Sequence, residues 1–89
     1  MAKGFVYILR SLKNNKFYVG STTDINERLR RHKAGNVKAT KCLLPIKLEL
    51  FQEYDDFSSA RKIEASLKKL KRRDFIEKIV RDKVIKMGP

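Results

Sequence analysis

Two short runs near the start of the chain, residues 5–10 (FVYILR) and 16–21 (KFYVGS), are rich in β-branched and aromatic residues. Runs of this kind, bounded by polar turn residues, are typical of β-strands. The segment that joins them contains Asn14 and Asn15, and asparagine tolerates the positive φ angles that tight turns require. The pattern therefore predicts a β-hairpin.

The parity of the hairpin decides which side chains share a face. With a turn centred on Asn14 and Asn15, Tyr7 would lie opposite Thr22, and Tyr18 opposite Ser11. Because strand side chains alternate, one face would carry both tyrosines with a glycine and a threonine: Tyr7, Tyr18, Gly20 and Thr22. The other face would be apolar enough to form core, with Val6, Ile8, Phe17 and Val19.

A helix is expected to begin near Asp24, because Asp24 with Glu27 three residues later is a capping-box pattern. Gly35 is a suitable residue for the position just after the end of this helix, where glycine is common. Within it Arg28 and His32 are four positions apart, so their side chains share a face.

The second half of the chain predicts one strand and two helices. After a loop broken by Pro45, residues 47–54 form a candidate third strand with apolar Leu48, Leu50 and, less regularly, Phe51. Residues 57–71 form a candidate helix whose apolar stripe is Ala60, Ile63, Leu67 and Leu70. A further helix is expected to start at Asp74, where Glu77 repeats the capping-box spacing, and to carry Phe75, Ile76, Ile79, Val80 and Val84.

These elements predict the α+β class, with a small three-stranded, mostly antiparallel sheet flanked by three helices. The 89 residues suit one domain, residues 1–89, and 42% of them are hydrophobic, which is sufficient for one core.

The charge is strongly unbalanced, with 22 Lys and Arg against 10 Asp and Glu, a formal net charge of +12. Half of the basic residues fall between Arg61 and Lys86, so the outward faces of the last helices should be positive. Such a surface attracts polyanions, of which nucleic acid is the leading candidate and an anionic membrane surface the second. The chain has no Trp, and its aromatic residues occupy strands and helix stripes, so base stacking is not indicated.

The single cysteine, Cys42, excludes an internal disulfide and suits a reducing, cytoplasmic setting. It has no sequence context of a catalytic nucleophile, which favours a packed or semi-exposed thiol. No apolar run approaches the ~20 residues that span a bilayer, and the first residues do not form a secretory signal. The expected partner is therefore nucleic acid and not a membrane.

An ordered set of polar and aromatic residues suggests an activity. It consists of two tyrosines, an arginine, a histidine and a glutamate: Tyr7, Tyr18 in Tyr18-Val19-Gly20, Arg28, His32 and Glu64. In this order the chain resembles the GIY-YIG nuclease superfamily, particularly its small single-domain bacterial members. The family's alanine and lysine around the glutamate match Ala60 and Lys68. One departure is Phe5, where the first motif has a glycine; Gly4 lies one residue early.

The resemblance implies an endonuclease that hydrolyses nucleic-acid phosphodiester bonds with one divalent metal. Glu64 would be the metal ligand, for Mg²⁺ or Mn²⁺, since Mg²⁺ prefers one or two carboxylates with water and phosphate oxygens. Arg28 would bind phosphate oxygens with its planar guanidinium. One of the tyrosines, Tyr7 or Tyr18, would act as base, and His32 would hold a tyrosine hydroxyl or a phosphate. The expected substrate is DNA, with a repair or single-stranded intermediate as one candidate.

Each residue alone also has a simpler interpretation. The tyrosines could be half-buried strand aromatics, and Glu64 could merely form an ion pair with Lys68 four residues on. The alternative function is a non-catalytic nucleic-acid-binding module that kept the fold; a ribosome-associated basic protein is a third. Strand preference, metal identity and oligomeric state are left open.

Overall fold

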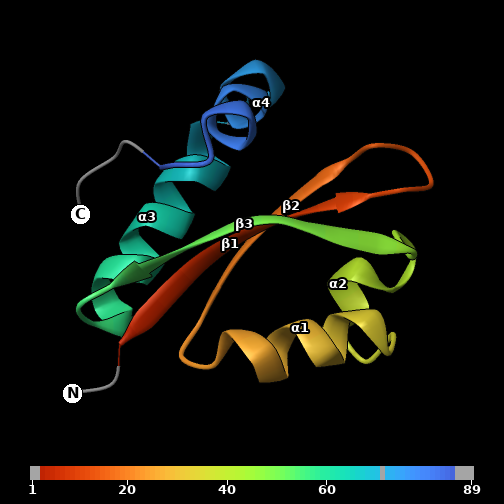
Figure 1. Cartoon of the computed structure of the whole chain (residues 1–89), viewed down its shortest axis with the longest axis horizontal. Helices are drawn as coiled ribbons and strands as arrows, with labels where there is room; N and C mark the ends of the chain where they lie inside the picture. Colours follow the sequence, from red (N-terminus) through yellow and green to blue (C-terminus); the bar gives the residue numbers. More distant parts are fainter. Residues whose placement is uncertain (1–2, 71, 86–89) are drawn as a thin grey trace.

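The sheet has three strands, and all of its pairings are antiparallel (Figure 1). The computed structural model describes residues 3–70 and 72–85. Strand β1 (Gly4–Ser11) lies between β2 (Phe17–Thr22) and β3 (Ile46–Tyr54). The predicted α+β class and antiparallel sheet are confirmed, and β2 is an edge strand.

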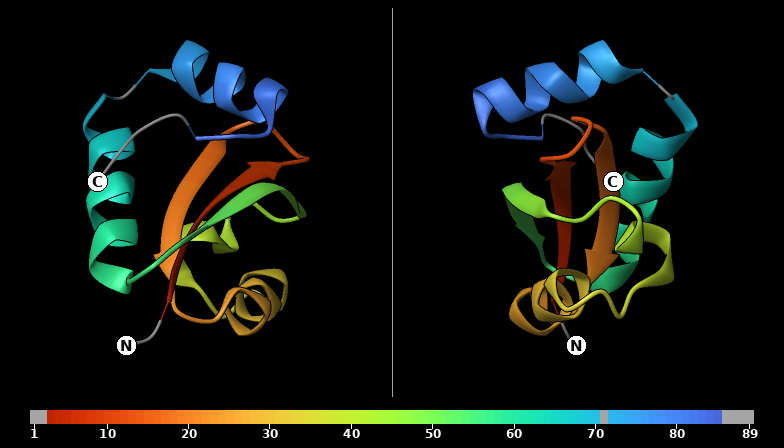
Figure 2. Two further views of the ribbon diagram at one scale, coloured as in Figure 1. Left: turned by 60° about the vertical axis from the view of Figure 1, so that its left-hand side comes forward. Right: turned by 90° about the vertical axis from the view of Figure 1, so that its right-hand side faces the viewer.

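Helices lie on both sides of this sheet (Figure 2). Helix α1 (Ile25–Lys33) and the short helix α2 (Lys38–Lys41) lie on one side, and α3 (Phe57–Leu70) and α4 (Arg73–Asp82) on the other. Three of the helices were predicted, whereas α2 was not, because its four residues fall in a segment that was expected to be a loop. In the described parts of the chain, no helix combines the length and apolar character needed to cross a membrane.

The β1–β2 register differs from the predicted one. Tyr7 pairs with Gly20 and Leu9 with Tyr18, so β2 is displaced along β1 by two residues. The turn lies earlier than expected: the Ser11 amide donates to the Lys16 carbonyl at 2.8 Å, and Asn15 takes the positive φ of 63°. A shift of two residues preserves strand parity, so the predicted division of side chains between the two faces still holds.

Each face of the sheet contributes to its own core. On the α3 and α4 side, Val6, Ile8, Val19 and Leu50 pack with apolar residues of both helices: Ala60, Ile63, Leu67, Ile76 and Ile79. On the α1 side, Tyr7, Leu9 and Ile46 pack with partly buried side chains that include Tyr18, Ile25 and Leu29. The alternation of the central strand therefore places Tyr7 in the smaller core, beside α1.

A β-bulge in β3 explains why its apolar pattern is irregular. Ile8 pairs with Leu50 and Leu9 with Leu48, which leaves Glu49 as the extra residue. The bulge places Leu48 and Leu50 in different cores. Phe51 is half exposed, at 51%.

Two of the apolar residues predicted to be buried on the last two helices are partly exposed. Leu70 is 43% exposed, and Val84 lies beyond the end of α4 and is 37% exposed, whereas Ile85 is buried and was not predicted. Residue 71, the expected end of the first of these helices, lies outside the described residues.

Helix starts follow the predicted caps only in part. At α1, the Asp24 carboxylate accepts from the Glu27 amide at 3.1 Å, as predicted, but Glu27 pairs with Arg30 and does not complete the capping box. Gly35 follows the helix with φ 79°, the left-handed conformation expected there. At α4 the predicted cap is wrong: the helix starts at Arg73, and the Asp74 carboxylate pairs with Arg72.

Candidate active site

The structure brings Tyr7, Arg28 and His32 into one hydrogen-bonded group between β1 and α1. The Tyr7 hydroxyl lies 2.8 Å from His32 Nε2, and Arg28 Nε donates to the same hydroxyl at 3.4 Å. Arg28 and His32 can both contact this hydroxyl because they lie four residues apart on α1 and so share one face of the helix. Tyr7 and His32 are almost fully buried, with 1% and 0% of their surface exposed.

Tyr18 completes an aromatic cluster with the same two rings. Its ring centroid lies 6.4 Å from that of Tyr7 and 5.4 Å from that of His32, and the Tyr7 and His32 rings are 5.5 Å apart. Tyr18 is on the edge strand and is only partly buried. The two tyrosines therefore differ: Tyr7 is buried and hydrogen-bonded, whereas Tyr18 is partly exposed at the edge of the cluster.

Gly20 allows Tyr7 to occupy its position. A Cβ atom at residue 20 would lie 2.4 Å from the Tyr7 hydroxyl oxygen and 2.5 Å from the adjacent ring carbon. Because Tyr7 and Gly20 are paired across the strands, the absence of a side chain at residue 20 creates the space for the phenol.

Thr40, which the sequence did not suggest, holds the far side of the histidine. Its hydroxyl lies 2.7 Å from His32 Nδ1, and it is fully buried on α2. The same hydroxyl donates to the Val37 carbonyl at 3.5 Å, which makes it the acceptor for an Nδ1–H proton. His32 Nε2 then carries no proton and accepts from Tyr7. The hydrogen bonds thus run in one direction, from Arg28 through Tyr7 and His32 to Thr40.

The protonation states agree with this direction. Burial, with the neighbouring Arg28 charge, lowers the pKa of His32 from 6.5 to about 4. Burial also raises the pKa of Tyr7, although its hydrogen bond with Arg28 opposes the shift. At neutral pH His32 is therefore a neutral acceptor and Tyr7 a protonated donor.

Glu64 lies on α3 and contacts Ser21 of β2, whose side chain points to the α3 side of the sheet because it alternates with Gly20. One of its carboxylate oxygens accepts a hydrogen bond from the Ser21 hydroxyl, and the other lies 2.7 Å from Lys68 Nζ. Lys68 Nζ also lies 5.4 Å from the Tyr18 ring centroid. Glu64 is thus joined to the aromatic cluster through Lys68, and the ion pair that the simpler interpretation expected is present. Ser21 was not singled out in the sequence.

The donor set around Glu64 limits which metal could bind. Within residues 3–70 and 72–85, no cluster of three or more His, Cys, Asp or Glu side chains could hold an ion. A carboxylate has about four lone-pair sites, and Ser21 and Lys68 fill two of those of Glu64. The remaining capacity fits a hard cation that keeps most of its ligands as water or phosphate oxygens, as Mg²⁺ does.

The first motif departs from the expected pattern without disturbing Tyr7. Phe5 packs edge-on against Phe51, with ring centroids 6.1 Å apart. The close backbone approach occurs one residue earlier, where a Cβ on Gly4 would lie 2.6 Å from Phe57 Cα.

The structure is a small α+β domain in which a polar and aromatic group lies between the sheet and α1. The sequence matches the GIY-YIG catalytic domain over residues 3–79. The chain belongs to the GIY-YIG family, and its domain is therefore that of a nuclease family that acts on nucleic acids.

Related proteins of similar size occur in several bacteria. A UPF0213 protein of Listeria welshimeri is 39% identical over 71 residues, which cover 79% of this chain and 78% of the relative. A UPF0213 protein of Syntrophus aciditrophicus is 36% identical over 81 residues, 89% of this chain and 92% of the relative. One from Streptococcus pyogenes is 36% identical over 72 residues, 80% and 77% of the two chains. The names of these relatives state no activity. No solved structure matches the chain.

Proposed function

We propose that the protein is a metal-dependent endonuclease that hydrolyses phosphodiester bonds, with DNA as its substrate. The observation that carries the proposal is the meeting of Tyr7, Arg28 and His32 in one directed hydrogen-bond chain, with Tyr18 and Glu64 at its rim. A solvated surface or an ordinary core gives no reason for these five side chains to gather.

We assign the role of base to Tyr7, because among the described residues it alone of the two tyrosines has a proton acceptor hydrogen-bonded to its hydroxyl. A water molecule that attacks phosphorus would give its proton to the Tyr7 oxygen, while Tyr7 passes its own proton to His32 Nε2. The histidine would become an imidazolium whose Nδ1–H is held by Thr40. The leaving oxygen would take a proton from solvent. Such positioned proton transfers typically contribute 10²–10⁴-fold.

Arg28 and Glu64 would stabilise the charge that develops on the phosphate. The guanidinium of Arg28 uses its Nε on Tyr7, which leaves its other N–H donors for phosphate oxygens. Glu64 would hold the Mg²⁺ or Mn²⁺ ion, which supplies charge stabilisation and lowers the pKa of bound water. Tyr18, at the rim, would contact the substrate beside the scissile phosphate.

The decisive experiment is cleavage of labelled single-stranded, duplex and branched DNA by the purified protein with Mg²⁺, Mn²⁺ or EDTA. We expect cleavage with either metal and none with EDTA. Glu64→Gln, which is close to isosteric, should abolish cleavage and leave DNA binding nearly intact. Glu53→Gln is a matched control, because it removes a carboxylate from a surface ion pair with Lys3. Wild-type cleavage by Glu64→Gln would disprove the assignment.

The Glu64–Lys68 ion pair favours one second function. Because both carboxylate oxygens of Glu64 already have partners, the domain could be a nucleic-acid-binding module without catalysis. In that case the wild-type protein binds DNA with either metal present but never cuts it, and Glu64→Gln lowers the melting temperature by breaking the pair.

A further inference from the structure

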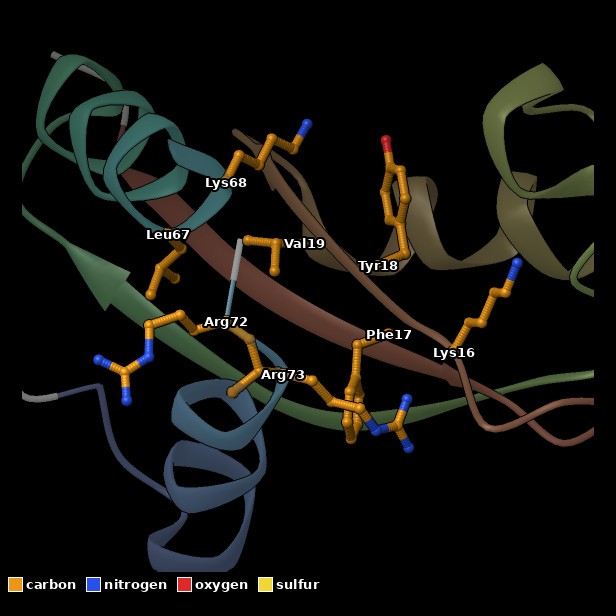
Figure 3. A pocket seen from close by; sticks show the side chains of 9 residues that line it. Lys16, Phe17, Tyr18, Val19, Leu67, Lys68, Arg72 and Arg73 are labelled. Carbon is orange, nitrogen blue, oxygen red and sulfur yellow. The ribbon is translucent and has the colours of Figure 1, made fainter. Parts of the chain in front are cut away.

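A groove of about 360 Å³ lies between β2 and the junction of α3 with α4 (Figure 3). Its floor is apolar and includes Phe17, Leu67 and Ile76. Its rim carries four cations, Lys16, Lys68, Arg72 and Arg73. None of the described residues that line it is acidic, so a ligand with negative charge and an apolar part suits it.

The rim cations can be recruited by an anion. Arg72 pairs with Asp74 at 2.8 Å and Arg73 with Glu77 at 3.1 Å, and all four of these side chains are more than half exposed. Exposed ion pairs of this kind contribute little to stability, so a phosphate can compete with the carboxylates for the guanidinium groups. The Lys16 ammonium has no ion-pair partner among the described residues.

The groove opens directly onto the candidate active site. Lys68 and Tyr18 belong to both: the Lys68 ammonium contacts Glu64 at 2.7 Å, and it lies over the Tyr18 ring. Figure 3 shows the Lys68 amine and the Tyr18 hydroxyl pointing toward the same side of the groove. A nucleotide in the groove would therefore neighbour a phosphate bound at Arg28 and Glu64.

We propose that this groove binds an unpaired nucleotide next to the scissile phosphate, with the base on the apolar floor and the phosphate on the cationic rim. Paired bases are stacked inside a duplex and cannot reach such a floor, whereas a single-stranded or bulged base can. The proposal rests on the proposed nuclease function and specifies its substrate as DNA with an unpaired nucleotide at the cleavage site.

Phe17 is the side chain best suited to test the floor. It is partly buried, and the Arg73 guanidinium lies over its ring, with 4.9 Å between the guanidinium carbon and the ring centroid. Removing the ring takes away apolar floor and also frees the cation. Phe51 offers a matched control, because it is an aromatic strand residue that contacts Phe5 and does not line the groove.

The test is binding in EDTA, measured by fluorescence anisotropy, so that its outcome does not depend on cleavage. Three duplexes of the same length are compared: fully paired, with one unpaired thymidine, and with one unpaired abasic residue. The thymidine duplex should bind roughly tenfold more tightly than the abasic duplex, which carries the same phosphates but no base. Phe17→Ala should remove most of this difference, and Phe51→Ala should not.

The rim is tested by salt dependence on single-stranded DNA. Lys16→Ala should reduce the slope of log affinity against log salt by about 0.7, the value for one phosphate contact. Lys78→Ala, on α4 and outside the groove lining, should leave the slope unchanged. If Phe17→Ala does not fold, amide NMR shifts of the wild-type protein with the thymidine duplex should move at Phe17, Leu67 and Ile76.

Equal affinity for the thymidine and abasic duplexes would overturn the groove proposal, even if the protein cuts DNA. NMR shifts confined to other parts of the molecule would also overturn it. Conversely, base-dependent binding that Phe17→Ala removes would support the groove even if no metal produces cleavage, in which case only the nuclease proposal fails.

Discussion

The hydroxyl of Thr40 can be removed almost without changing the shape of the core, by Thr40→Val. It is fully buried and lies 2.7 Å from His32 Nδ1. Valine would leave His32 Nδ1 buried without a hydrogen-bond partner, which costs about 1–3 kcal/mol. In a domain of this size each kcal/mol lowers the melting temperature by about 4–8 °C. We therefore expect a clear loss of stability that is short of complete unfolding.

The same substitution should reverse the hydrogen bond between His32 and Tyr7. Without Thr40 as acceptor, the imidazole proton is better placed on Nε2, where it points at the Tyr7 oxygen, 2.8 Å away. Tyr7 then has no acceptor for its own proton. Metal-dependent cleavage should fall by roughly 10²-fold or more, since proton transfer by a positioned group contributes 10²–10⁴-fold. Thr40→Ser keeps the hydroxyl and should restore most of the rate.

The assay combines initial cleavage rates below the melting temperature with the ¹⁵N shifts of the His32 ring, which report where the proton lies. Thr23→Val is a suitable control, because it makes the same change at an exposed threonine. If Thr40→Val cuts at the wild-type rate with the proton still on Nδ1, the reasoning is wrong. It is also wrong if Thr40→Ser is as inactive as Thr40→Val.

Three further predictions concern substitutions in the same group of residues. Gly20→Ala should displace the Tyr7 phenol, because its Cβ would lie 2.4 Å from the hydroxyl, and cleavage rates should fall more than DNA affinity. Arg28→Ala should reduce cleavage by roughly 10²–10³-fold, and Arg28→Lys should recover only part of it, since an ammonium lacks the planar fork. Tyr7→Phe should be nearly inactive and Tyr18→Phe only impaired; normal cleavage by Tyr7→Phe would show that Tyr7 is merely a core aromatic.

One outcome concerns stability and pH. The pKa of His32 falls from 6.5 to about 4 on folding, so the unfolded chain binds the proton first as the pH drops. The contribution of the neutral His32 to the free energy of unfolding is fully present above pH 6.5 and is lost as the pH falls toward 4. The loss is at most about 3 kcal/mol. Urea unfolding at pH 7 and pH 4 should show a larger decrease for the wild type than for His32→Gln; equal decreases would contradict the buried, neutral histidine.

Several features of the site were predictable from sequence because they are local. Alternation along β1 and β2 assigns Tyr7, Tyr18 and Gly20 to one face, and that assignment survives the two-residue error in register. The four-residue spacing of Arg28 and His32 places them on one side of a helix whose start Asp24 marks. These signals depend on backbone periodicity and on capping, which neighbouring residues determine.

Other features depended on contacts between distant segments, and only the tertiary structure decided them. Thr40 lies in a segment without apolar periodicity, and its role arises because α2 packs against the end of α1, beside His32. Glu64 meets Ser21 across 43 positions of sequence, because α3 packs against the face of β2 to which Ser21 points. Likewise, the groove that pairs Phe17 with Leu67 exists only because the junction of α3 and α4 lies beside β2. A local pattern specifies which face a side chain occupies, but its partner from a remote segment is set by how the helices pack on the sheet.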